Sequence, residues 1–141
     1  MGTPDFSVLH IEDDPLWASL VASNLRGAPG IRACWQAATA AEGLALARQH
    51  QPDLVVLDLN LPDARGTDLA SDLILQLHPP RILLLTVRHD ALTLHLAGQT
   101  SISGLLWKES HLPALLPAVR AVAAGQHYFP SEVQSAMREL R

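Results

Sequence analysis

The stretch Asp53-Leu-Val-Val-Leu-Asp58 decides the fold class, because four consecutive apolar residues lie between two acids. A strand that is apolar at every position is typical of the centre of a parallel sheet, where helices cover both faces. Strand-length apolar runs lie on both sides of this stretch, at residues 7–11, 31–35, 81–86 and 104–108. Segments with helical spacing of apolar residues separate these runs. The chain therefore alternates strand and helix five times.

Five consecutive strand–helix units predict an α/β domain with a parallel sheet, because parallel neighbours need crossover helices between them. In a chain of 141 residues they fit a flavodoxin-like doubly wound fold. This fold is a five-stranded parallel sheet of order 2-1-3-4-5 with helices on both faces. We expect the domain to span residues 5–125. Residues 126–141 are expected to be a tail, or the start of a linker to an output domain that this chain lacks.

Several helix boundaries can be predicted from local signals. Asp14 followed by Pro15 predicts an N-cap and a first helical position. Thr39-Ala-Ala-Glu42 matches a capping box. The segment Asp90–Leu96 is expected to be helical on a weaker pattern. Pro117 falls inside the last predicted helix, so that helix either starts late, near Pro113, or is kinked.

The composition excludes several classes of protein. Apolar residues make up 48% of the chain and charged residues 17%, which allows a buried core and argues against disorder. A net charge of −4 lacks the basic footprint of a nucleic-acid-binding domain. The single cysteine, Cys34, permits no internal disulfide. We expect a cytoplasmic chain without a signal peptide or membrane span, because no basic n-region and no run of roughly 20 apolar residues is present.

The residues that end the predicted strands carry the candidate chemistry. They are Glu12 and Asp13 after the first run, then Asp58, Thr86 and Lys108. Ligands of open parallel sheets bind beyond the carboxyl ends of the strands, so these side chains should meet at one edge. Clustered carboxylates repel one another without a cation, and hard oxygen ligands favour Mg²⁺. With that ion bound, Asp58 could attack phosphorus, and Lys108 and Thr86 could stabilise the charge that develops.

In these motifs the sequence resembles the receiver domains of two-component response regulators. The resemblance covers about residues 5–125, and four weak motifs in the right order make it specific. The matching residues are the acidic pair Glu12-Asp13, the loop Asp58-Leu-Asn-Leu-Pro62 with Gly66 beyond it, Thr86 and Lys108. The C-terminal stretch Gly104–Gly125 is most similar to receivers that precede helix-turn-helix output domains. The resemblance implies a role in phosphorelay signalling and in transcription regulation.

The resemblance implies a role for each matching residue. Asp58 would accept a phosphoryl group from a sensor histidine kinase or a phosphotransfer protein. Asp13 and Asp58 would bind Mg²⁺ directly, Asn60 through its backbone carbonyl, and Glu12 through a water molecule. Lys108 would pair with the phosphoryl group. The resemblance also implies a signalling domain rather than an enzyme.

The resemblance further implies a conformational switch that Thr86 controls. Thr86 would turn towards the phosphoryl group on activation, and the change would reach an output partner or a homodimer. Three positions depart from the family. Leu105 replaces the usual aromatic switch residue, Val87 stands where a small residue is common, and Glu109 replaces a proline. Leu105 and Val87 keep open an alternative, a pseudo-receiver that binds protein partners without phosphorylation.

Other functions fit the residues less well. An aspartate-nucleophile phosphatase typically needs a second acid two residues after the nucleophile, where this chain has Asn60. A flavin module needs a phosphate-binding loop after the first strand, where Glu12-Asp13-Asp14 would repel phosphate. Asp14 is better explained as a helix cap, and His10 as a buried strand residue.

Overall fold

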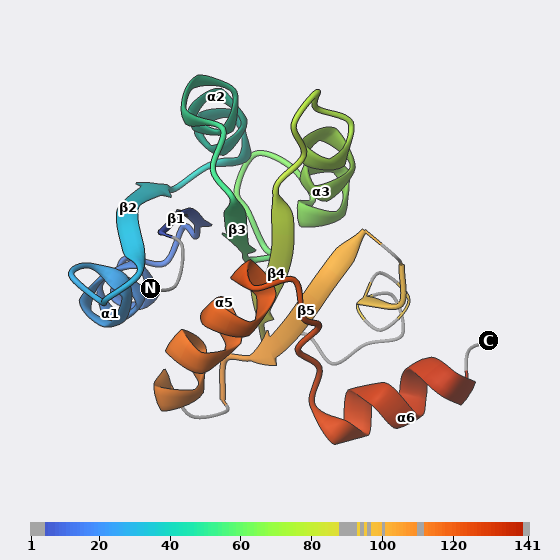
Figure 1. Ribbon diagram of the computed structural model, residues 1–141. Helices are drawn as coiled ribbons and strands as arrows, with labels where there is room; N and C mark the ends of the chain where they lie inside the picture. The colour runs from blue at the N-terminus through green and yellow to red at the C-terminus, as the bar shows by residue number, and fades with distance from the viewer. Residues whose placement is uncertain are drawn as a thin grey trace.

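The strands form one parallel sheet in the order β2-β1-β3-β4-β5, which confirms the predicted fold class. The computed structural model (Figure 1) describes residues 5–87, 93, 95, 97–99, 101–109 and 112–139. The strands are β1 (Phe6–Ile11), β2 (Ile31–Ala37), β3 (Leu54–Leu57), β4 (Arg81–Thr86) and β5 (Ile102–Trp107). The helices are α1 (Pro15–Leu25), α2 (Ala40–His50), α3 (Gly66–Ile74), α5 (Leu115–Ala123) and α6 (Ser131–Glu139), with a 3₁₀ turn over Leu112–Ala114.

Alternation along each strand sorts the apolar side chains into two layers, one on each face of the sheet. Along β3, Val55 and Leu57 pack in one layer, and Leu54 and Val56 pack in the other. Figure 1 shows α1 and α5 on one face and α2 and α3 on the other. All four β3 side chains are buried, as the unbroken apolar run predicts.

The same alternation holds in β5, at the edge of the sheet. Leu105 and Trp107 lie in the layer under α2 and α3, whereas Leu106 lies in the layer under α1 and α5. Trp107 therefore faces away from Leu106, as the alternation of side chains along a strand requires. Leu105 is fully buried, so the position of the expected aromatic switch residue holds a core side chain.

Local capping explains where the first two helices begin. The Asp14 side chain accepts a hydrogen bond from the Leu16 amide at 2.9 Å, which confirms it as the N-cap of α1. Thr39 Oγ1 accepts from the Glu42 amide at 3.1 Å, one half of the predicted capping box of α2. Both helices therefore start one residue after a side chain that satisfies a free backbone donor.

The last predicted helix starts late rather than kinking at Pro117. A 3₁₀ turn occupies Leu112–Ala114, and α5 begins only at Leu115. Pro117 is thus the third helical residue, where the backbone N–H has no partner inside the helix. Its missing donor costs no hydrogen bond there. The other predicted helix, Asp90–Leu96, lies for most of its length outside the described residues.

The segment after α5, expected as a tail or the start of a linker, lies along the edge of β5 and contains α6. The Tyr128 amide donates to Ser103 O at 3.0 Å, and the Leu105 amide donates to Tyr128 O at 2.9 Å. Gly104 makes this approach possible, because a Cβ there would lie 2.8 Å from Tyr128 O. Val133 of α6 is buried against the core. This helix has few apolar residues, and the expectation of a tail or linker over residues 126–141 did not include it.

Candidate functional site

Four strands deliver the predicted polar residues to the carboxyl edge of the sheet. Glu12, Asp58 and Lys108 are each held by a backbone hydrogen bond that continues the strand ladder beyond the strand end. The Glu12 amide donates to Ala37 O at 2.9 Å, and the Asp58 amide to Ile11 O at 3.1 Å. Lys108 is fixed in the same way, through its amide and Thr86 O at 2.9 Å. The predicted juxtaposition of strand ends is therefore observed.

The three acids form one cluster. A carboxylate oxygen of each of Glu12, Asp13 and Asp58 lies within 4.8 Å of the others. Glu12 and Asp58 are each only 3% exposed, whereas Asp13 is exposed to solvent. The cluster thus has a buried floor and one acid at its mouth. Asn60 lies beside it, and its amide donates to Asp58 Oδ1 at 3.3 Å.

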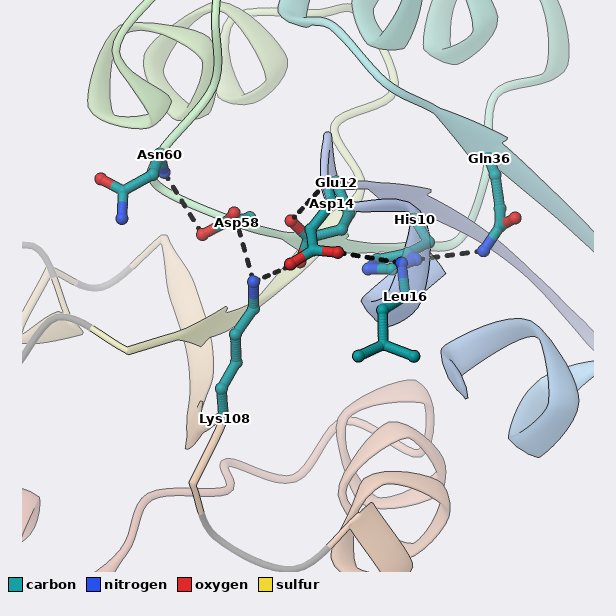
Figure 2. Close-up of polar contacts among 8 residues, drawn as sticks. All are labelled: His10, Glu12, Asp14, Leu16, Gln36, Asp58, Asn60 and Lys108. Carbon is teal, nitrogen blue, oxygen red and sulfur yellow. Dashed lines mark hydrogen bonds and ion pairs between the residues drawn. The ribbon is translucent and has the colours of Figure 1, made fainter. Parts of the chain in front are cut away.

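Lys108 reaches the floor of this cluster from the end of β5 (Figure 2). Its Nζ lies 2.5 Å from Glu12 Oε1 and 3.4 Å from Asp58 Oδ2. It also lies 5.2 Å from the centre of the Trp17 ring, within the range of a cation–π contact. The ammonium is almost fully buried, so solvent screens these interactions weakly.

The charges of the cluster do not balance. Three carboxylates face one ammonium, and burial raises the pKa of Glu12 to about 7, with a hydrogen bond to Asp58 as the next cause. The hydrogen bond to Lys108 acts against this rise but does not cancel it. A divalent cation would remove the imbalance. Hard carboxylate donors and an open side at Asp13 suit Mg²⁺, which keeps several of its waters.

The loop between β3 and α3, residues 58–65, is tightly closed. Asn60 and Arg65 form an antiparallel bridge, and the Gly66 amide donates to Leu59 O at 3.1 Å. A Cβ on Gly66 would lie 2.5 Å from Leu59 Cα, so only glycine permits this approach. Sequence reasoning named Gly66 through the family resemblance alone; close packing against the backbone beside Asp58 is its physical reason.

Sequence reasoning missed Asp63, at the outer end of the same loop. Its two carboxylate oxygens accept the amides of Ala40 and Ala41 at 2.7 and 3.0 Å, at the first turn of α2. These two hydrogen bonds lower the pKa of Asp63. Ala40 and Ala41 are 23 and 22 residues away from Asp63 in the sequence, so no local motif predicts the contact.

The candidate switch residues lie at the same edge. Thr86 ends β4, is fully buried and pairs in register with Trp107. Val87, the next residue, is 52% exposed beside the edge. The structure thus brings Thr86 next to Lys108 and, through it, to the acid cluster, as predicted.

A buried histidine, His10, lies on β1 below the cluster. His10 is buried as predicted, and its Nδ1 lies 3.3 Å from Gln36 Nε2, which also donates to Ala18 O at 2.7 Å. Burial, and after it the positive charge of Lys108, lowers the pKa of His10 to about 3. His10 therefore stays neutral in the folded protein, whereas it binds a proton in the unfolded chain below pH 6.5.

This difference predicts an acid sensitivity that belongs to His10. Because the pKa is depressed on folding, the unfolded state binds the extra proton, and stability falls as the pH drops from about 6.5. Glu12 has the opposite sign between pH 7 and 4.5, so the effect must be isolated by comparison with His10→Asn. We expect the difference in unfolding free energy between the native chain and this variant to shrink by about 1.5 kcal/mol from pH 6.5 to 5. Urea unfolding with a chelator present measures it, and a pH-independent difference would contradict the prediction.

Comparisons with known proteins agree with this geometry. The family model of the response regulator receiver domain matches residues 8–120. The chain is 32% identical over 131 residues to the transcription regulator BvgA of Bordetella pertussis, covering 93% of this chain and 62% of that protein. It is 30% identical over 138 residues to the nitrate/nitrite response regulator NarP of Escherichia coli, covering 98% and 64%. The chain thus spans less than two thirds of the length of these relatives.

Solved structures give the same result. A two-component response regulator of the LuxR family from Aurantimonas superposes with a TM-score of 0.85 at 26% identity, covering 97% of this chain and 98% of that one. No helix in the described part of the chain is long and apolar enough to cross a membrane. Fold, strand-end residues and relatives therefore agree, and the chain belongs to the response regulator receiver domain family of two-component signalling proteins.

Proposed function

We propose that this receiver domain accepts a phosphoryl group on Asp58 in a Mg²⁺-dependent reaction, and passes the change to an output partner. The observation that carries the proposal is the position of the Asp58 carboxylate. It lies among two further acids and 3.4 Å from a buried ammonium, at the edge where parallel sheets bind ligands. Receiver domains of response regulators interact with histidine kinases, so the proposed donor is a sensor histidine kinase or a phosphotransfer protein, and the proposed location of the chain is the cytoplasm.

The acid cluster and the family resemblance support a proposed cation site. Asp13 and Asp58 would hold Mg²⁺ directly, the Asn60 backbone carbonyl would be a third ligand, and Glu12 would bind through water. When bound, Mg²⁺ neutralises the acids and draws charge from the phosphoryl oxygens. The Glu12 carboxyl, whose pKa is raised to about 7, would be held ionised by a cation bound beside it.

The transfer step conserves atoms and charge. A carboxylate oxygen of Asp58 forms a bond to phosphorus while the bond from phosphorus to the donor's imidazole nitrogen breaks. The imidazole leaves with the electron pair of that bond and takes a proton from solvent water. Lys108 exchanges its contact with Asp58 Oδ2 for the incoming phosphoryl oxygens, and the Thr86 hydroxyl donates to another of these oxygens. The product is an acyl phosphate on Asp58.

The readout differs from the usual threonine–aromatic coupling, because Leu105 is a fully buried core residue. We infer that movement of Thr86 is felt at β5 through its neighbour Trp107, with which it is in register. The output would be a helix-turn-helix domain elsewhere in the full-length protein or a homodimer. This chain itself would bind neither nucleic acid nor membrane.

Intact mass spectrometry tests the proposal on the native chain. Incubation with acetyl phosphate and Mg²⁺ should add one phosphoryl group, and the adduct should be lost on treatment with hydroxylamine, which cleaves acyl phosphates. Excess chelator should prevent the gain. No gain with a folded protein would reject the proposal and favour the pseudo-receiver, an interpretation supported by Leu105 and by the bulk of Val87 at the mouth of the site.

A further inference from the structure

Asp63 joins the loop that carries Asp58 to a helix on the far side of the cluster. Its carboxylate accepts both the Ala40 and the Ala41 amide, so one side chain caps two free donors of α2. Among the described residues, Asp63 is the only residue of that loop whose side chain forms hydrogen bonds with α2. Because the two hydrogen bonds have a charged acceptor, they are stronger than neutral ones.

Through Asp63, α2 is connected to the part of the loop that contains Asn60. Asn60 lies three residues before Asp63, and its amide is held by Asp58 Oδ1 at 3.3 Å. On the other side, the Asn60–Arg65 bridge closes the base of the loop. The loop is thus fixed at its base by backbone contacts, at Leu61 by packing against the core, and at its outer end by the hydrogen bonds of Asp63. A free outer end would let the Asn60 carbonyl turn away from the cluster.

The other attachment of α2 also leads to the cluster. Ala37 O, which ends β2 just before α2, accepts the Glu12 amide at 2.9 Å. This bond fixes the position of the start of α2 relative to Glu12. The hydrogen bonds of Asp63 then fix the loop that carries Asp58 and Asn60 to the same end of α2.

We propose that Asp63 is a positioning residue for the cation site, which holds the Asn60 carbonyl in place by tying the β3–α3 loop to the first turn of α2. This proposal rests on the proposed function, since it assigns Asn60 to the cation. It predicts that Asp63→Ala weakens Mg²⁺ binding about tenfold, the lower end of the loss seen when a residue that orients a metal ligand is removed. Asp63→Asn retains one carbonyl acceptor, so its Mg²⁺ affinity should lie between those of the native chain and Asp63→Ala.

Thr39→Ala is the matched control. It removes the other side-chain cap of the same helix turn, the bond from the Glu42 amide to Thr39 Oγ1, but leaves the loop untouched. If Asp63 served α2 alone, both variants would affect Mg²⁺ binding equally. The binding is followed by tryptophan fluorescence, because Trp17 lies 5.2 Å from Lys108 Nζ at the site. A tenfold loss in Asp63→Ala with native affinity in Thr39→Ala supports the proposal, and equal affinities overturn it.

Hydrogen exchange without Mg²⁺ separates this proposal from the function beneath it. The amides of Asn60 and Gly66 are bonded within the loop, to Asp58 Oδ1 and Leu59 O. Both should exchange faster in Asp63→Ala than in the native chain or in Thr39→Ala. If the native chain binds no Mg²⁺, the proposed function fails, and this exchange pattern alone decides whether Asp63 positions the loop. Unchanged exchange at both amides would overturn the proposal.

Discussion

Asp58→Asn is expected to abolish phosphoryl uptake completely, because an amide is a far weaker nucleophile than a carboxylate and does not form the acyl phosphate. The substitution keeps the shape of the side chain, and the Oδ1 atom can still accept a hydrogen bond from the Asn60 amide. It also removes one of three clustered carboxylates, which repel one another without a cation. We therefore expect the variant to fold, with a thermal midpoint in chelator no lower than that of the native chain.

The measurement is intact mass after incubation with acetyl phosphate and Mg²⁺. Asp72→Asn is the matched control, since it makes the same chemical change at an exposed acid of α3, away from the cluster. The control should gain one phosphoryl group like the native chain. A gain of the same size in Asp58→Asn would show that another residue accepts the group, and the site described here would then lose its central assignment.

Lys108→Ala is expected to cause the largest loss of stability at the site. The ammonium is the only cation in contact with the buried acids among the described residues, at 2.5 Å from Glu12 and 3.4 Å from Asp58. Removing one partner of a buried ion pair leaves an uncompensated charge. We expect the unfolding free energy in chelator at pH 8 to fall by about 3 kcal/mol. Added Mg²⁺ should recover part of this loss, because the ion can take over the neutralisation.

The pH dependence gives this prediction a sign that can be checked. Glu12 already has a pKa of about 7 with Lys108 present, and the loss of the ammonium removes a contribution that lowers it. The carboxyl is therefore neutral at pH 6 in the variant, and the loss of stability should be smaller there than at pH 8.

Arg48→Ala serves as the control for charge alone, because Arg48 is an exposed cation of α2. It should change the unfolding free energy by less than about 0.5 kcal/mol. Urea unfolding at both pH values, with chelator and with Mg²⁺, measures all of these quantities. A loss for Lys108→Ala as small as that of the control would mean that the buried pair contributes nothing to stability.

The sequence by itself determined the fold class, the strand order and the members of the acid cluster. The unbroken run Leu54–Leu57 requires cover on both faces, and strand-length runs with helices between them leave few topologies. The site followed from one rule, that parallel strands end at a common edge. Glu12, Asp58 and Lys108 could be named because each directly follows a strand whose boundary the apolar pattern predicts.

Only the tertiary structure decided which of these groups touch, and what holds them. The sequence placed Lys108 at the edge, but its contact with Glu12 depends on the distance across β3 and β4, the two strands between β1 and β5. The two hydrogen bonds between Asp63 and α2 also join segments more than twenty residues apart, as does the pairing of Tyr128 with β5. Local signals such as periodicity, caps and turns report on neighbours in the chain. Contacts between distant segments form only when packing brings their backbones together, so no pattern in the sequence announces them.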